Sequence, residues 1–413
     1  MMVLAGADLV LPDRVVERGT LVIRDGRIEA IRSRAVDGPA GATRIDCSGQ
    51  VIVPGFIDVH VHGIEGIDAL DGAGAVADMA GRLPKYGVTA FCPTSVACGP
   101  ATLAALLTAV AAARRSLAPR SARVLPAHLE SNFINPDWNG AQPRRCLRLP
   151  PRPGDQEPRD GARRGGTLVP PVDPVDGEFS ALDILDVIAR HRDAAGIITL
   201  APELPGGLEL VRALVAAGHR VSLGHTGASY DEAKAAIEAG ACQATHLFNR
   251  MSAPTSRSPG VVGAVLESES VAAEIICDGV HVHPALVALA MRAKTARRLM
   301  AITDGTAGSG LPPGSRARLG EQDIIVTAQS AQLADGTLAG SVLTMDGAFR
   351  RLVQQAGVSL TDAARLCSTT PAAELGLAEV GAIAAGRMAD LVVLGPGLAV
   401  RRTYVAGSAV WEH

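Results

Sequence analysis

The middle of the chain repeats one pattern eight times: a short apolar run, a polar end, and then a stretch with helical character. The runs span residues 51–61, 88–95, 123–130, 197–203, 221–225, 241–247, 272–278 and 299–304. Strands that alternate with helices form parallel sheets, so the pattern predicts an α/β fold, and eight units favour a (β/α)8 barrel of the TIM type. An open doubly wound sheet is the alternative, but His60-Val61-His62-Gly63 after the first run is not the glycine-rich turn that such a sheet carries.

Helices and a second, smaller domain complete the predicted architecture. We expect helices at the amphipathic segments, residues 73–86, 100–117, 181–191, 207–217 and 229–239. Both chain ends carry short alternating apolar runs instead, at residues 3–11, 19–24 and 27–31 and again at 389–394, 400–405 and 407–411. We therefore predict a barrel over residues 54–379 and a small flanking β-sandwich domain that residues 1–53 and 380–413 build together.

One segment breaks the alternation of strands and helices. Residues 143–176 are rich in arginine, proline, glycine and aspartate, and they include Arg163-Arg164-Gly165-Gly166. We expect a long insertion loop with little regular structure. Such loops are either functional lids or surface insertions, and the sequence leaves both open.

The net charge and the cysteine content limit which binding partners and which cellular compartment we expect. A net charge of −3 and an aromatic content of 3% argue against nucleic acid and against an anionic membrane surface as partners. The longest Ala/Leu stretch, residues 101–113, is too short to span a bilayer. Seven cysteines are an odd number and form no CxxC motif, which favours free thiols in a reducing compartment. We expect a cytoplasmic protein.

The ends of the predicted strands carry most of the chemistry. Active sites of such barrels lie at the carboxyl ends of the strands, where the sequence places His60, His62, His128, Glu130, His225, His246, His281 and Asp304. Residues i and i+2 of a strand point the same way, so His60 and His62 can reach one ion. Each residue taken alone has a structural interpretation, such as a core histidine, an ion pair or a helix cap. Together they predict a nitrogen and oxygen site for Zn²⁺ or Fe²⁺ of the kind that hydrolytic enzymes use.

Two longer stretches, residues 54–63 and 386–394, resemble the amidohydrolase superfamily. Several shorter motifs narrow the resemblance to the N-acetylglucosamine-6-phosphate deacetylases: 128–130, 199–203, 224–226, 245–249, 278–281, 303–305 and 338–341. The resemblance implies a metal-dependent barrel enzyme, often a homodimer. Its reaction would remove the acetyl group from N-acetyl-D-glucosamine 6-phosphate, giving D-glucosamine 6-phosphate and acetate in amino sugar catabolism.

The resemblance also assigns roles to individual residues. It implies the main metal ligands Glu130, His225 and His246, and a second set, His60 and His62, so that one or two divalent ions, Zn or Fe, would bind. It implies that Asp304 acts first as base and then as acid. It further implies substrate contacts from His281 beside the amide, and from Asn249 and Arg257 at the phosphate, the arginine reaching across a dimer interface.

The sequence departs from the family on the substrate side. Gln142 stands where the family has a substrate-contacting histidine, and Arg250 stands where it has a small residue. We expect both to be substrate contacts, Arg250 at a phosphate or at a carboxylate. These departures leave alternatives open: a deacylase of another N-acyl amino sugar or sugar acid, a cyclic amidase, or a metal-binding scaffold without activity. Against the scaffold stands Asp304, a carboxylate that metal binding alone does not require.

Overall fold

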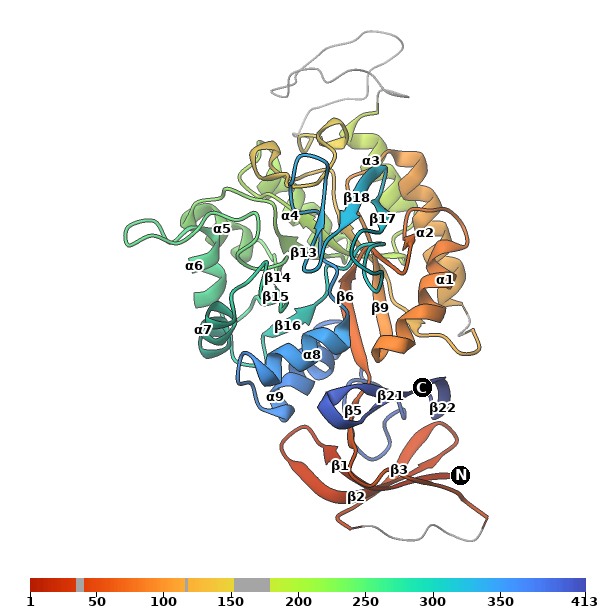
Figure 1. Ribbon diagram of the computed structural model, residues 1–413. Coiled ribbons are helices and arrows are strands. Elements are labelled where there is room, and N and C mark those ends of the chain that lie inside the picture. The colour runs from red at the N-terminus through yellow and green to blue at the C-terminus, as the bar shows by residue number, and fades with distance from the viewer. Residues whose placement is uncertain (35–40, 116–117, 152–178) are drawn as a thin grey trace.

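The computed structural model describes residues 1–34, 41–115, 118–151 and 179–413 (Figure 1). Most of the predicted insertion loop at 143–176 lies outside the described residues. Before it, η3 (Arg144–Cys146) and an irregular stretch to residue 151 pack on the loops of the barrel, for example through Cys146 and Leu147 against Ile134. None of the helices in the described ranges is long and apolar enough to cross a membrane.

Eight parallel strands form the predicted barrel. They follow the order β6 (Phe56–Val61), β9 (Val88–Ser95), β11 (Ala127–Glu130), β12 (Ala195–Leu200), β13 (Arg220–Leu223), β14 (Gln243–Ala244), β15 (Ala272–Ile276) and β16 (Leu299–Ile302), and short β10 (Arg123–Val124) pairs with β9. The ring closes just beyond β16, where Gly305 bridges to Val61 and the Asp304 amide donates to the His60 carbonyl at 2.9 Å. The (β/α)8 prediction is therefore confirmed.

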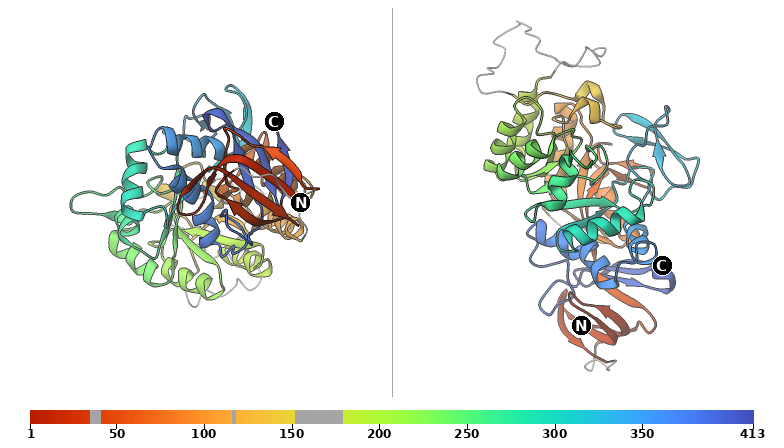
Figure 2. Two further views of the ribbon diagram at one scale, coloured as in Figure 1. Left: turned by 90° about the horizontal axis from the view of Figure 1, so that it is seen from below. Right: turned by 90° about the vertical axis from the view of Figure 1, so that its left-hand side faces the viewer.

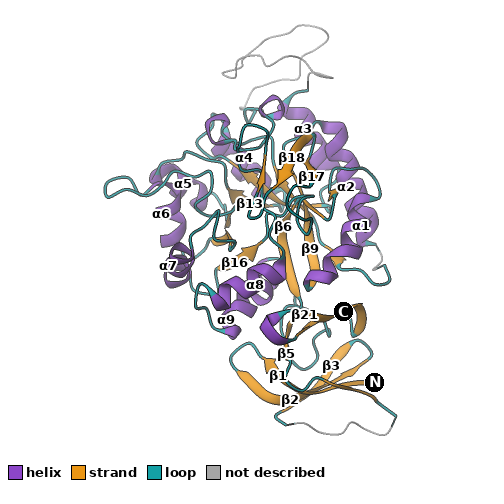
Figure 3. Cartoon of the chain, in the orientation of Figure 1, coloured by secondary structure: helices purple, strands orange, loops and turns teal. Residues whose placement is uncertain are grey.

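Helices surround the strands and bury their apolar faces against them (Figure 3). They are α1 (Ala75–Arg82) with η1 (Leu83–Tyr86), α2 (Pro100–Arg114), α3 (Ala181–Arg190), α4 (Gly207–Ala216), α5 (Tyr230–Glu238), α6 (Gly260–Glu267), α7 (Pro284–Lys294), α8 (Met345–Gln354), α9 (Leu360–Ala364), the π-helical η4 (Arg365–Thr369) and α10 (Thr370–Glu374). Ser180 and Ser229 begin α3 and α5 with capping boxes, which satisfy the free amides of the first turn. The five helices expected from the sequence all form.

Both termini build the small β domain, which lies at one end of the barrel (Figure 2, right). One series of strands runs β22 (Ser408–Glu412), β21 (Val400–Val405), β20 (Leu391–Leu394), β5 (Val51–Pro54), β1 (Met2–Val10), β2 (Val15–Arg24) and β3 (Arg27–Arg32), with β4 (Thr43–Asp46) beside β1. Side chains of its two halves share one core, for example Leu4 and Ile28 with Leu391 and Tyr404. The sequence prediction of a flanking β domain is thus confirmed, and its strands form one continuous series.

Two small sheets at the barrel mouth were not expected. A hairpin of β7 (Gly63–Ile64) and β8 (Ile67–Asp68) follows the His60-Val61-His62 segment, and a three-stranded sheet of β17 (Arg316–Leu319), β18 (Gln322–Val326) and β19 (Ala331–Gln332) follows β16. Leu319 and Ile324 of the latter pack on Val96 and Ala141 at the barrel mouth. The carboxylate of Asp68 accepts a hydrogen bond from the Gly320 amide at 2.9 Å and so joins the two sheets.

A partly buried ion pair joins the barrel to the β domain. Arg123 of β10 donates from Nε to Asp390 Oδ2 at 2.9 Å and from Nη2 to Oδ1 at 3.2 Å. The Asp390 carboxylate also accepts from the Ala406 amide at 2.7 Å, and its own carbonyl accepts from the Gly55 amide at 2.9 Å. Asp390, from the 386–394 motif, therefore fixes how the two parts of the molecule join.

We expect Asp390→Ala to lower the free energy of unfolding by about 3 kcal/mol, because it leaves the Arg123 guanidinium and the Ala406 amide without their acceptor. Urea denaturation monitored by circular dichroism measures the loss. The matched control is Glu412→Ala, whose carboxylate is half exposed in its pair with Arg402 and should cost less than about 1 kcal/mol. Equal losses in the two variants would contradict the assignment.

Candidate metal centre at the barrel mouth

One group of candidate ligands meets at the ends of three neighbouring strands. Glu130 closes β11, while His225 and His246 lie two residues beyond β13 and β14. Glu130 Oε1 lies 2.9 Å from His225 Nε2 and 2.8 Å from His246 Nε2, and the two nitrogens are 3.1 Å apart. All three side chains are buried. The structure therefore brings together the three residues that the sequence resemblance implied as the main ligands.

A second group forms where the barrel closes. His60 and His62 come from β6 and the residue after it, and Asp304 follows β16. Asp304 Oδ1 lies 3.2 Å from Nε2 of each histidine, and the two Nε2 atoms are 3.2 Å apart. Glu130 lies between the groups, with Oε1 3.8 Å from His60 Nε2 and Oε2 3.6 Å from His62 Nε2. The two groups form one continuous cluster.

Three residues of this cluster have a strained backbone. His225, His246 and Asp304 have φ values of 48°, 33° and 49°, in the left-handed region that residues with a Cβ rarely occupy. Each such conformation costs about 1–3 kcal/mol and persists only where the surroundings enforce it. Hydrogen bonds of the flanking backbone do so here, for example from the Asp304 amide to the His60 carbonyl. The strain turns the three side chains inward from the strand ends.

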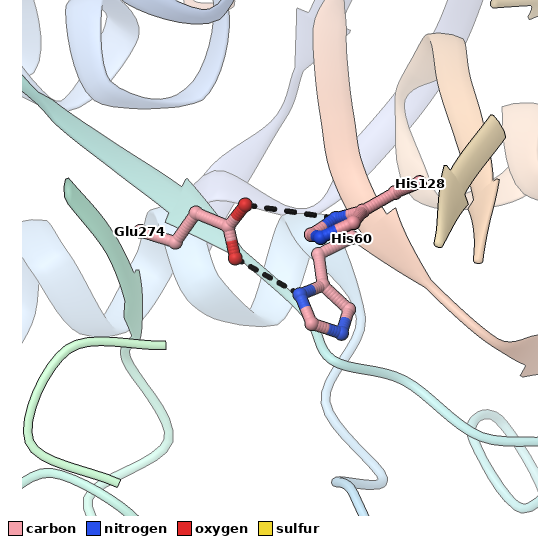
Figure 4. Close-up of side chains that lie close together, drawn as sticks. All are labelled: His60, His128 and Glu274. Atoms are coloured by element: carbon pink, nitrogen blue, oxygen red, sulfur yellow. Dashed lines mark hydrogen bonds and ion pairs between the residues drawn. The ribbon is translucent and has the colours of Figure 1, made fainter. Parts of the chain in front are cut away.

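The hydrogen-bond chemistry of the cluster fits a cation. His225 Nδ1 lies 2.8 Å from the Trp138 carbonyl, and because a carbonyl only accepts, Nδ1 carries a proton and Nε2 faces Glu130. His60 Nδ1 likewise lies 2.9 Å from the Glu274 carboxylate (Figure 4). Its Nε2 faces Asp304 Oδ1 at 3.2 Å. Imidazole nitrogens and carboxylate oxygens therefore converge at one place, where either a shared proton or a divalent cation satisfies them.

The electrostatics of the cluster also favour a positive charge. Burial alone would raise the pKa of Asp304, but His60 and His62 hold that pKa well below its usual range through their charges and their hydrogen bonds. Burial alone would lower the pKa of His60, but Asp304 and Glu274 raise it well above its usual value. The carboxylates are thus ionised and attract either a proton or a metal cation to the histidines.

His281 is held beside this cluster by an aspartate. Its Nδ1 donates to Asp278 Oδ2 at 2.6 Å, and its amide donates to Asp278 Oδ1 at 2.8 Å. Although burial opposes it, the hydrogen bond and charge of Asp278 raise the pKa of His281, and Asp304 contributes to the same shift. Asp278 therefore favours the imidazolium form, whose Nε2–H is a donor.

The predicted substrate contacts lie in the loops around the mouth. Gln142 is buried, donates from Nε2 to Glu130 Oε2 and accepts from the Ala97 amide at 2.7 Å. The Asn249 side chain donates to the His246 carbonyl at 3.2 Å. Arg250 is exposed and lies close to Gly140. Arg257 is exposed in the loop that leads into α6 and protrudes from the barrel (Figure 1). The structure thus brings Gln142 to the candidate ligands, while Arg257 lies outside the cluster.

Two carboxylates around the cluster were missed in the sequence. Glu203 accepts hydrogen bonds from the Thr226 hydroxyl at 2.5 Å and from the Gly227 amide at 2.7 Å, and these bonds stabilise the turn after His225. Glu274 lies inside β15 and contacts His60. The available signal for Glu274 was a charged residue in the middle of an apolar strand, Ala272-Ala273-Glu274-Ile275-Ile276, where burial requires a partner.

Comparison with known proteins places the chain in a family. The model of the Amidohydrolase family matches residues 51–410, so the chain belongs to the amidohydrolase family. An N-acetylglucosamine-6-phosphate deacetylase of Rattus norvegicus is 36% identical over 380 residues, which cover 89% of this chain and 85% of the rat protein. Within the amidohydrolases the chain accordingly belongs with the N-acetylglucosamine-6-phosphate deacetylases.

A solved structure and a second relative extend the comparison. The N-acetyl-D-glucosamine-6-phosphate deacetylase of Mycobacterium smegmatis, a mutant in complex with N-acetyl-D-glucosamine-6-phosphate, superimposes with a TM-score of 0.84 at 32% identity over 99% of both chains. An N-acetylgalactosamine-6-phosphate deacetylase of Escherichia coli O157:H7 is also 32% identical, over 94% of this chain and 93% of that protein. Relatives of this degree of similarity therefore differ in the sugar that their names give.

If the cluster binds a divalent cation, adding Zn²⁺ to the metal-free protein should stabilise the fold. At a hundred times its dissociation constant, the ion should raise the free energy of unfolding by about 2.7 kcal/mol, because it binds only the folded chain. At the same Zn²⁺ concentration His246→Ala should lose at least about 1.4 kcal/mol of this gain, the equivalent of a tenfold weaker affinity. Thermal unfolding followed by calorimetry measures both.

The matched histidine control is His413→Ala, at the exposed C-terminal residue away from the cluster. It should keep the full Zn²⁺ effect, and a chelator should reverse that effect. Stabilisation that His246→Ala leaves intact would rule out the cluster as the binding site.

Proposed function

We propose that the protein hydrolyses the acetamide of N-acetyl-D-glucosamine 6-phosphate and releases D-glucosamine 6-phosphate and acetate. The observation that carries the proposal is Asp304, an ionised carboxylate that is buried against His60 and His62 at the mouth of an amidohydrolase barrel. The deacetylases among its relatives and the M. smegmatis complex with the same sugar phosphate support the choice of substrate.

One or two divalent ions, Zn²⁺ or Fe²⁺, belong to this proposal. Glu130, His225 and His246 would hold one ion, and His60, His62 and Asp304 would hold a second. Imidazole nitrogens and carboxylate oxygens are ligands that suit either metal. When bound, such a cation lowers the pKa of water and polarises a carbonyl group.

The residues of the chain divide the proton transfers between them. Asp304 accepts a proton from the attacking water as a new C–O bond forms at the acetyl carbon, and then passes that proton to the amine as the C–N bond breaks. The imidazolium Nε2–H of His281, oriented by Asp278, donates a hydrogen bond to the acetyl oxygen as negative charge develops there. No proton is gained or lost over the cycle.

The loops around the mouth would bind the sugar phosphate. Arg250 and Arg257 are exposed guanidinium groups, which pair well with phosphate, and Asn249 follows His246 in the same turn. A second candidate substrate, another N-acyl amino sugar or sugar acid, is favoured by Gln142, because its amide is occupied by Glu130 and Ala97 rather than free for a sugar hydroxyl. Gln142 would then contact a substrate only after exchanging these partners.

The assembly and compartment of the protein are further parts of the proposal. We propose a cytoplasmic homodimer in which Arg257 reaches the phosphate bound by the partner subunit, supported by its protruding loop and by seven cysteines that all carry free thiols. Residues 1–53 and 380–413 would form one unit around the catalytic unit of 54–379, supported by the antiparallel pairing of β20 with β5.

Asp304→Asn should reduce turnover by about a thousandfold or more, because an amide cannot exchange the proton, which removes the general base and acid together. Acetate release from N-acetyl-D-glucosamine 6-phosphate measures turnover, and elemental analysis measures bound metal, which the asparagine oxygen should largely preserve. Near-normal turnover in this variant would exclude the role of Asp304.

The same assay tests the substrate. Wild-type protein should release acetate faster from N-acetyl-D-glucosamine 6-phosphate than from the unphosphorylated sugar or from N-acetyl-D-galactosamine 6-phosphate. Equal rates with and without the phosphate would contradict the phosphate-binding role of the arginines. Faster release from N-acetyl-D-galactosamine 6-phosphate would identify that epimer as the substrate.

Subunit complementation tests the role of Arg257 across the dimer. Arg257→Ala and Asp304→Asn should each be nearly inactive alone. Mixed after separate unfolding and refolded together, they should regain about a quarter of wild-type activity, because half of the dimers are mixed and each mixed dimer has one complete site. Activity that stays at the level of the two parents would place Arg257 at the site of its own subunit or outside it.

A further inference from the structure

Glu274 is an ionisable residue that the proposed reaction does not use. It lies in the middle of β15 with no exposed surface, between apolar neighbours. A carboxylate in such surroundings is retained only where donors surround it.

The donors to Glu274 connect it with both ligand groups. Oε1 accepts from Gln243 Nε2 at 2.6 Å, and Oε2 accepts from His60 Nδ1 at 2.9 Å (Figure 4). Oε2 also lies 3.3 Å from the backbone amide of His246. Glu274 therefore orients the ring of a candidate ligand only in the His60 group, whereas in the other group it touches only the backbone of His246.

His128 also borders the carboxylate, with its Nδ1 3.6 Å from Glu274 Oε1 (Figure 4). Its Nδ1 lies 3.0 Å from the Val59 carbonyl and so carries the proton, whereas burial lowers its pKa to about 4 and leaves Nε2 as an acceptor for the Thr199 hydroxyl at 2.8 Å. Its ring packs edge-on against His60, with centroids 4.5 Å apart and an interplanar angle of 66°. His128 thus limits the rotation of the His60 ring, while Glu274 receives the His60 proton.

We propose that Glu274 is a positioning residue for the cation position of His60, His62 and Asp304, and that this position depends on Glu274 while that of Glu130, His225 and His246 does not. A carboxylate on Nδ1–H fixes the tautomer of a ligating histidine and raises the basicity of its Nε2. In the other group the Trp138 carbonyl does this for His225. The inference rests on the proposed function, because it presumes that the cluster binds cations.

Titration of the full-length metal-free protein with Co²⁺, followed by calorimetry and by the visible absorption of the bound ion, tests the proposal. Wild-type protein should take up two equivalents. In Glu274→Gln a single amide oxygen replaces two acceptors for His60 and Gln243, so the second equivalent should bind about 10–100-fold more weakly while the first is unchanged. Glu374→Gln is the matched control, since Glu374 is a largely buried carboxylate that pairs with Arg220 and Arg298, and it should bind like the wild type.

A double-mutant cycle with His60→Ala separates positioning from a general structural effect. If Glu274 acts through His60, Glu274→Gln should change nothing further in the His60→Ala background, whereas general damage to the barrel would add its effect there. The inference is overturned if wild-type protein takes up only one equivalent, or if Glu274→Gln weakens both equivalents alike or neither. These outcomes would not contradict the proposed hydrolase activity. Wild-type protein that binds no Co²⁺ overturns the proposed metal-dependent function itself.

Discussion

The closure of the barrel between β16 and β6 is the interaction on which the site depends. Just beyond β16 the Asp304 amide donates to the His60 carbonyl at 2.9 Å, and the amides of His62 and Gly63 both donate to the Gly305 carbonyl. Gly63 is required at this point, because a Cβ there would lie 2.3 Å from the Ile67 carbonyl oxygen and 2.5 Å from the Ala307 nitrogen. These hydrogen bonds bring Asp304 to the two histidines although about 240 residues separate them in sequence, a span that the parallel strand order bridges.

Because the carboxylates at this closure are buried, their neighbours determine their pKa values. Beneath the closure, the Thr303 hydroxyl donates to Asp58 Oδ2 at 2.6 Å, and burial raises the pKa of Asp58 to about 7. At the mouth, the histidines hold the pKa values of Glu130 and Asp304 low despite equal burial. Carboxylates with similar exposure therefore differ in charge according to their neighbours, and the negative charge collects where the histidine lone pairs converge. Low local dielectric makes that charge a strong attractor for a cation.

The sequence predicted the residues that follow the ends of the strands, and it failed for a weakly patterned sheet and for a charged residue inside a strand. His60, His62, Glu130, His225, His246 and Asp304 follow recognisable apolar runs, and the carboxyl ends of parallel strands must meet at one face. The β17–β19 sheet was missed because its strands are short and half exposed, so their alternation is weak. Glu274 was missed because its signal, one charge within a buried strand, marks a partner without identifying it. His60 becomes that partner only once the barrel has closed.

Gln142 lies in a loop, and its contacts differ from the substrate contact that the sequence predicted. Gln142 was expected at the substrate, and in the structure its amide bridges Glu130 and Ala97. It lies in a loop that the Trp138 carbonyl also anchors, through His225. A glutamine at this position can donate to a carboxylate and accept from an amide at once, and a neutral histidine can also do both, but with its two nitrogens in one rigid ring. Gln142 therefore couples its loop directly to the candidate ligand Glu130.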